Sequence, residues 1–131
     1  WFAVLYKARC ERFAKLYDDC RTTCLKALAE KPDWAEFWME LAYLETAQNN
    51  HLRALGWTMQ AMERPLVPST LFREADKYTD QPYRLASWAA EHLGDKAHAI
   101  EYGKLAQKKI GGPDKDWDLR IERLEASAPK S

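Results

Sequence analysis

Small residues recur along this chain at a constant spacing of 34 positions. The pairs with this spacing are Ala8 and Ala42, Cys20 and Ala54, and Ala27 and Ala61. Small side chains allow two helices to approach each other closely. A period of this length indicates a repeated helix–turn–helix unit. One such helix pair cannot bury its apolar face alone, so we expect successive pairs to stack on a shared core.

Beyond the second repeat the spacing lengthens to 45 positions, which is 34 plus 11. The pairs with this spacing are Trp38 and Tyr83, Asn49 and Gly94, Ala54 and Ala99, and Ala61 and Ala106. The plain period then returns, since Trp117 lies 34 positions after Tyr83. A single insertion at residues 66–79 brings these registers into agreement. Within it we expect Ser69 to cap a short helix through Ala75, and apolar residues such as Tyr78 to pack on the stack.

The second repeat shows the unit most clearly. Two stretches of helical composition flank the polar turn Gln48-Asn49-Asn50. Asp33 is predicted to cap the first of these helices, with Glu36 as its capping-box partner. The chain has only five glycines and six prolines, most of which lie between the helical stretches, and β-branched residues are few. We therefore predict an all-α protein without strands.

A last helix is predicted after the break at Gly111-Gly112-Pro113, with Pro113 positioned to start it. Trp117, Ile121 and Leu124 follow at i, i+4 and i+7, which makes one apolar stripe on an otherwise charged segment. We predict that this helix, residues 114–127, caps the end of the stack.

The pattern resembles the tetratricopeptide repeat (TPR), a family with a large residue at position 4, Leu and a small residue at 7 and 8, Ala at 20 and 27, and Pro near 32. The second repeat matches through Trp38, Leu41, Ala42, Ala54, Ala61 and Pro65. The first repeat departs at Lys7, where Leu is usual. At position 11, where the family has Tyr, the three repeats carry Glu11, Glu45 and Ala90.

The resemblance implies one domain over residues 1–131, a right-handed stack of antiparallel helix pairs. This TPR-like solenoid would hold about 3.5 repeats and seven main helices, with one insertion. The repeats would span about 1–32, 33–65 and 80–112, followed by the capping helix.

The TPR resemblance also implies a concave groove lined by the first helix of each pair. Position 9 of the three repeats is occupied by Arg9, Tyr43 and Trp88, which would form a row across the groove. Aromatic and arginine side chains are frequent binding anchors. The residues expected to contact a protein or peptide partner, or a second copy, are Arg9, Arg12, Met39, Tyr43, Arg84, Trp88 and His92. In the alternative, Tyr43 and Trp88 belong to the core or lie under the insertion.

Catalytic, metal and cofactor sites are not predicted. His51, His92 and His98 show no spacing typical of a catalytic dyad or zinc site, and His51 and His98 fall near turn ends. Asp116 and Asp118 match an Asp-x-Asp string, but they fall in the first turn of a helix, where acidic residues favour the helix dipole.

The bulk properties exclude several partners. The 20 basic and 20 acidic residues balance, so nothing indicates a nucleic-acid partner, and the apolar runs are too short to span a membrane. The odd count of three cysteines favours a reducing compartment such as the cytoplasm. Cys20 and Cys24, four residues apart on one helix face, are expected to be buried core residues.

A second resemblance covers roughly half the chain and starts at Pro82-Tyr83-Arg84-Leu85-Ala86-Ser87. This run, with Leu93-Gly94-Asp95 and Ala99-Ile100-Glu101-Tyr102-Gly103 after it, is similar to the helical-repeat tail of bacterial and phage family-2 glycosyltransferases. That resemblance implies a non-catalytic accessory domain for dimerisation or acceptor docking, with the catalytic domain upstream. The missing initiator Met agrees with a chain that continues upstream of Trp1. A free-standing TPR scaffold that binds a peptide or helix is the alternative.

Overall fold

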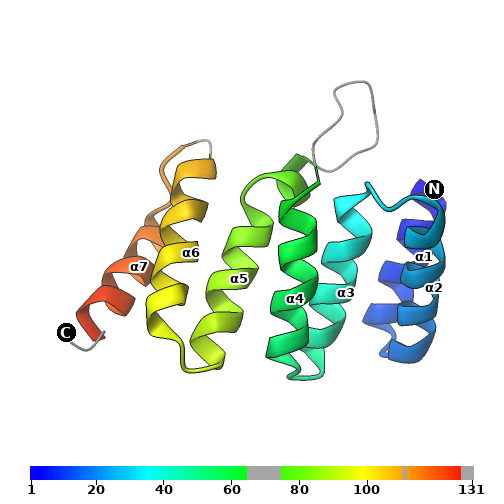
Figure 1. Ribbon diagram of the computed structural model, residues 1–131, viewed down its shortest axis with the longest axis horizontal. Helices are drawn as coiled ribbons and strands as arrows, with labels where there is room; N and C mark the ends of the chain where they lie inside the picture. Colours follow the sequence, from blue (N-terminus) through cyan, green and yellow to red (C-terminus); the bar gives the residue numbers. More distant parts are fainter. Residues whose placement is uncertain (65–74, 111, 128–131) are drawn as a thin grey trace.

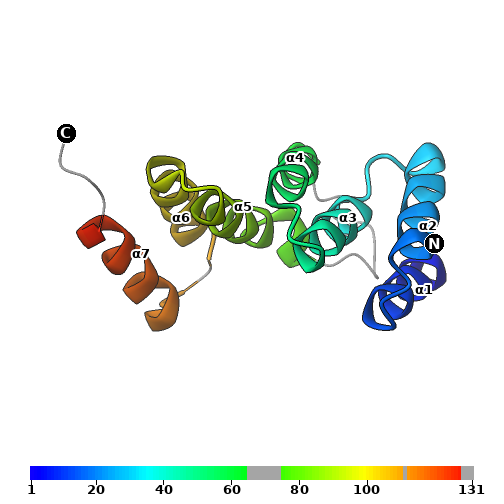
Figure 2. The same cartoon turned by 90° about the horizontal axis from the view of Figure 1, so that it is seen from below.

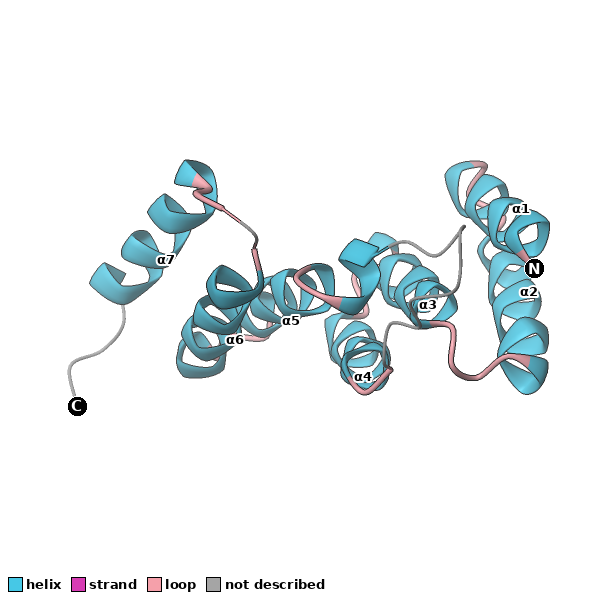
Figure 3. Ribbon diagram, turned by 90° about the horizontal axis from the view of Figure 1, so that it is seen from above, coloured by secondary structure: helices cyan, strands magenta, loops and turns pink. Residues whose placement is uncertain are grey.

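Seven α-helices and one short 3₁₀ helix follow one another in the computed structural model, which describes residues 1–64, 75–110 and 112–127. The helices are α1 (Phe2–Phe13), α2 (Tyr17–Glu30), α3 (Ala35–Ala47), α4 (His51–Met62), η1 (Ala75–Tyr78), α5 (Gln81–His92), α6 (Lys96–Lys109) and α7 (Lys115–Ser127). They lie side by side in chain order, so the α1–α2 pair forms one end and α7 the other (Figures 1 and 2). The described part contains helices and loops but no strand (Figure 3), which confirms the all-α prediction.

The three turns inside the helix pairs share one backbone conformation. Lys15, Asn49 and Gly94 have φ angles of 62°, 60° and 82°. These residues stand at the repeat spacings of 34 and 45. In each turn the next amide donates to a carbonyl five residues back. The three bonds join Leu16 to Glu11 (2.8 Å), Asn50 to Glu45 (2.8 Å) and Asp95 to Ala90 (2.9 Å). In each pair, a residue in the left-handed backbone conformation therefore follows the end of the first helix and reverses the chain.

The small residues at the repeat spacing are buried where helices meet. At most 1% of the surface is exposed in Ala8, Ala42, Cys20, Ala54, Ala99, Ala27, Ala61 and Ala106. Burial of Cys20 and Cys24 confirms that they are core residues. The neighbouring Cys20 thiol, and then burial, raise the pKa of Cys24, so its thiol stays protonated.

Within the described residues, the buried side chains form three clusters spaced along the row. The first joins α1, α2 and α3 through residues such as Leu5, Leu28 and Phe37. Trp38 and Trp57 pack against it, with their ring centroids 5.7 Å apart. The second cluster centres on Ala35, Met39 and Ala61, and the third on Ala90, Ala99, Ile121 and Leu124. Each cluster joins helices that are close in the chain, as expected for stacked pairs.

The helix α7 covers α5 and α6 through the predicted apolar stripe. Ile121 and Leu124 are 2% and 0% exposed, and Trp117 packs beside them. The Trp117 indole Nε1 donates to the Gly103 carbonyl oxygen at 3.0 Å. The helix begins at Lys115, so Pro113 does not start it. Asp114 caps it instead, because its carboxylate accepts from the Trp117 amide at 3.0 Å.

The predicted cap of α3 is also wrong. The N-cap position is Trp34, without a side-chain cap hydrogen bond, and Asp33 lies one residue earlier. The Ala35 amide donates to the hydroxyl of Tyr78 at 3.2 Å, and this hydroxyl donates to the Glu36 carboxylate. A residue of η1 therefore supplies the polar group that local sequence was expected to supply.

The end of the insertion packs on the helices, as expected for Tyr78. This side chain contacts the cluster of Ala35, Met39 and Ala61. Ser69 and the helix expected after it lie outside the described residues.

Candidate interaction surfaces

Arg9 and Arg12 lie at the contact between α1 and α3. The Nε of each donates to a different oxygen of Glu40 at 2.8 Å. The Glu40 side chain is 1% exposed, whereas the two arginines are 22% and 19% exposed. A buried carboxylate is strongly unfavourable unless it is paired. The two arginines expected to contact a partner therefore also bind the first helix pair to the second.

Tyr43 and Met39 differ in what they offer a partner. Met39 is fully buried in the core, so its expected place in a binding groove is wrong. Tyr43 is half-buried against the same cluster, and its hydroxyl donates to the Gln81 side chain at 3.3 Å. The Arg12 guanidinium lies 5.1 Å from the Tyr43 ring centroid. Tyr43, on α3, therefore contacts residues of both α1 and α5, and it is partly buried in the core.

Trp88 and His92 form an aromatic cluster with His51, which opens α4. The two imidazoles stack with centroids 4.4 Å apart, and the Trp88 and His92 rings meet edge to face at 4.0 Å. His92 is exposed and Trp88 is half-buried. Partial burial, and then the nearby His92, lower the pKa of His51. Aromatic surface is therefore available to a partner on α5.

Arg84 belongs to the polar contact between α5 and α7. It donates to Asp80 at 2.8 Å and to Asp114 at 3.0 Å. Farther along α5, the Glu91 carboxylate accepts from Arg120 at 2.7 Å and from Arg123 at 3.2 Å. The structure therefore groups Arg9, Arg12 and Tyr43 at one contact and Trp88 with His92 at another. Arg84 helps to hold α7.

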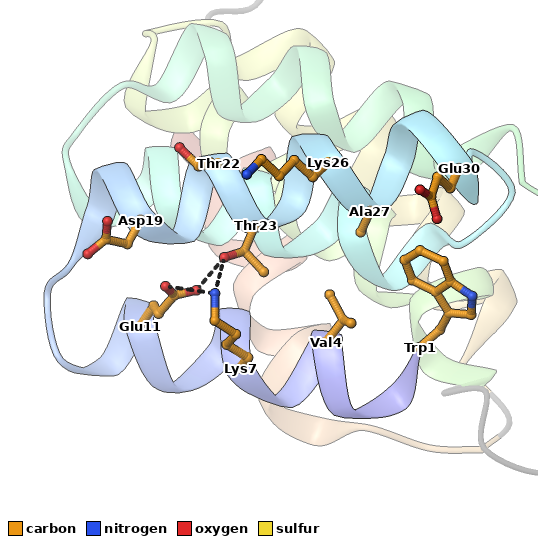
Figure 4. A pocket seen from close by; sticks show the side chains of 10 residues that line it. All are labelled: Trp1, Val4, Lys7, Glu11, Asp19, Thr22, Thr23, Lys26, Ala27 and Glu30. Atoms are coloured by element: carbon orange, nitrogen blue, oxygen red, sulfur yellow. Dashed lines mark hydrogen bonds and ion pairs between the residues drawn. The ribbon is translucent and has the colours of Figure 1, made fainter.

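A groove of about 350 Å³ lies between α1 and α2 at the end of the row (Figure 4). Its lining combines apolar, acidic and basic groups: Trp1, Val4, Lys7, Glu11, Asp19, Thr22, Thr23, Lys26, Ala27 and Glu30. The groove was missed from sequence. One signal in the sequence could have indicated it: Lys7 is a polar residue at the repeat position where the second repeat has the buried Leu41, 34 positions later.

Three side chains form a polar network at the floor of this groove (Figure 4). The Thr23 hydroxyl donates to Glu11 at 2.6 Å and accepts from the Lys7 amine at 3.1 Å. Lys7 also lies 3.5 Å from Glu11. Because these polar groups satisfy one another, the groove offers a mixed surface in which apolar contact comes from Trp1, Val4 and Ala27.

Neither a metal cluster nor a membrane-spanning helix was found in the described ranges. Among residues 1–64, 75–110 and 112–127, no three or more His, Cys, Asp or Glu side chains gather in a way that could hold a metal ion. Within these same ranges no helix is both long enough and apolar enough to cross a bilayer.

No protein-family model matches the chain, and no curated protein matches it significantly.

Proposed function

We propose that this chain is a TPR-type interaction domain, a right-handed stack of helix pairs that binds another protein. The observation that carries this proposal is the common geometry of the three turns at Lys15, Asn49 and Gly94. The buried small residues at the same spacing support it. Repeats of this kind build extended surfaces suited to binding proteins or peptides.

The domain is further proposed to serve as the accessory part of a family-2 glycosyltransferase, where it docks an acceptor protein or a second subunit in the cytoplasm. The similarity of residues 82–103 to the repeat tails of those enzymes supports this. A free-standing TPR scaffold is the alternative. The parent reading frame distinguishes the two: a strand-rich domain with an Asp-x-Asp string upstream of Trp1 is expected, and further repeats or a start codon directly upstream would contradict it.

The surface proposed to contact the partner is the aromatic cluster on α5. Arg9, Arg12 and Arg84 are held in ion pairs with Glu40, Asp80 and Asp114. Trp88 and His92 contribute aromatic area with less side-chain entropy to lose than long flexible residues have. These two residues therefore remain the best anchors of the predicted set.

The immobilised chain, exposed to extract of the parent organism, tests this surface. We expect His92→Glu to lose proteins that the wild type retains, because a carboxylate disrupts aromatic contact. The control His98→Glu changes another exposed histidine, on α6, and should retain them. Quantitative comparison of the bound proteins decides: identical sets for all three forms would exclude the α5 surface.

A further inference from the structure

A second groove, of about 380 Å³, opens between α4 and the α5–α6 pair, in the interior of the row. Its floor is apolar and consists of Leu52 and Leu55 of α4, Ala90 of α5 and Leu93, which follows α5. Leu52 is 71% exposed and Leu93 is 44% exposed. The turns beside the groove, between α3 and α4 and between α5 and α6, lie at the lower edge of the molecule in Figure 1. The groove therefore presents leucine side chains to solvent although helix pairs flank it on both sides.

The repeat spacing shows why this groove is open. At the preceding junction, Arg21 of α2 stands 34 positions before Leu55, and Glu45 of α3 stands 45 positions before Ala90. The Arg21 guanidinium is paired with the Glu45 carboxylate, and the Glu45 side chain is fully buried. Leu55 and Ala90 are shorter and carry no charge, so they cannot form this bridge. The space that an ion pair fills between the first two helix pairs is left open between the next two.

The rim of the groove carries hydrogen-bond acceptors. The Asp95 carboxylate accepts from the His98 amide at 3.1 Å, and its other oxygen lies 2.5 Å from the His98 Nδ1. The backbone bond, and then the side-chain bond, lower the pKa of Asp95, so this carboxylate is ionised at neutral pH. Because a carboxylate only accepts, the proton lies on Nδ1, and the Nε2 of the neutral ring is an acceptor too. The Tyr102 side chain completes the rim.

The charge on the lining is negative. Among the described residues that line the groove, Asp95 is the one acid, and neither lysine nor arginine is present. An apolar floor beside an acceptor-rich rim suits a ligand that has an apolar body and a cationic donor group. The volume is near the lower limit of ligand sites, roughly 300 Å³, so it suits a short segment and not a whole helix.

We propose that this groove binds a segment of a partner protein in which a bulky apolar side chain is followed by lysine or arginine. The apolar side chain packs on Leu52, Leu55 and Leu93, and the cation lies beside the Asp95 carboxylate. This inference rests on the proposed role as an interaction domain, but it concerns another surface, because neither Trp88 nor His92 lines the groove.

Three end-blocked dipeptides that differ only in their second residue test the proposal. They are the amides of acetyl-phenylalanyl-lysine, acetyl-phenylalanyl-glutamine and acetyl-phenylalanyl-glutamate. The isotope-labelled chain is titrated by NMR at pH 7.5, above the ordinary imidazole pKa of about 6.5. We expect the amide signals of Leu93 and Asp95 to shift. The lysine peptide should bind roughly two- to fivefold more tightly than the glutamine peptide, as for an ion pair exposed to water, and the glutamate peptide more weakly than both.

A charge-neutral variant separates the two parts of the site. Asp95→Asn keeps the cap of α6, because asparagine caps helices as well as aspartate does, but it removes the charge. The preference for the lysine peptide over the glutamine peptide should disappear in this variant. Asp116→Asn is the matched control, since Asp116 is an exposed acid in the first turn of α7. It should keep the full preference.

Two further variants test the apolar floor. The double variant Leu55→Arg/Ala90→Glu recreates the pair of Arg21 and Glu45, and it should close the groove so that even the glutamine peptide no longer binds. Leu52→Ser changes an exposed position and should weaken all three peptides severalfold. It tests the floor even if the double variant does not fold, which circular dichroism would show.

Three results would overturn the proposal: unshifted Leu93 and Asp95 signals with every peptide at millimolar concentration, a glutamate peptide that binds as tightly as the lysine peptide, or unchanged binding in Leu52→Ser. The proposed function fails separately. In that case the lysine peptide still binds in the groove, while His92→Glu leaves the proteins captured from the extract unchanged.

Discussion

Lys15, Asn49 and Gly94 hold the same left-handed backbone conformation with very different side chains. Glycine adopts this conformation without steric cost, and asparagine tolerates it. A lysine at φ 62° brings its Cβ close to the following carbonyl, which costs roughly 1–2 kcal/mol. The first turn therefore stores strain that the third turn avoids. The fold holds Lys15 in this conformation despite the strain, because the same backbone hydrogen bond closes all three turns.

Replacing Lys15 by glycine should stabilise the protein. We expect a gain of up to about 1 kcal/mol in the free energy of unfolding, since relief of strain exceeds the added flexibility of the unfolded chain. Gly94→Ala should cost about 1 kcal/mol for backbone reasons alone, because a Cβ there meets no heavy atom within 4 Å. Urea denaturation measures both variants.

The control for this prediction is Lys26→Gly, inside α2. Lys26 is exposed and helical, so glycine there should destabilise by about 1 kcal/mol. A Lys15→Gly variant that loses as much stability as Lys26→Gly would show that the first turn is not strained.

The contact between α6 and α7 depends on the absence of one side chain. A Cβ at Gly103 would lie 2.2 Å from the terminal methyl carbon of Ile121, far inside van der Waals contact. The Trp117 indole also bonds to the Gly103 carbonyl. Glycine at this position lets α7 approach α6 closely enough to bury the apolar stripe.

Gly103→Ala should therefore loosen α7. We expect a loss of roughly 1–3 kcal/mol, the usual range for overpacking a core. The double variant Gly103→Ala/Ile121→Val lacks the clashing methyl group and should regain part of that loss. Thermal unfolding compares the two, with Ile121→Val alone as the reference. No recovery in the double variant would place the strain elsewhere.

At the scale of elements, sequence predicted where helices lie better than how they begin. The helical stretches, the turns and the stripe of α7 follow from periodicity and composition, which are local properties. The cap of α3 comes from Tyr78, 43 residues from Ala35. No local pattern around Asp33 could reveal that, because the donor and acceptor meet only when η1 packs on α3.

At the scale of the whole molecule, stability should fall in two steps on acidification. His51 has a pKa below its ordinary value of 6.5, caused first by burial and then by His92. The unfolded chain then binds the proton more tightly, so stability decreases as the pH falls below about 6.5. Burial alone would raise the pKa of Glu91, but Arg120 and Arg123 outweigh it and hold this pKa below 4.5, so further stability is lost below about pH 4.5.

The first of these steps can be removed separately. His51→Gln keeps a polar side chain but has no titration near neutrality, so the variant should lose less stability than the wild type between pH 7 and pH 5, while the second step remains. Chemical denaturation at a series of pH values provides the comparison. A wild-type profile that is already flat in this range would contradict the role of His51.

The all-α class, the order of the helices, the repeat spacing and the buried small residues could all be predicted from sequence. These properties depend on periodic patterns, which each segment carries regardless of its neighbours. Which side chains face outward could not be predicted in this way, because it depends on how the helices pack in three dimensions. Arg12 pairs with Glu40, 28 residues away, and Met39 is buried although its register suggested a groove. Which part of a helix face is covered depends on the orientation of the neighbouring helices.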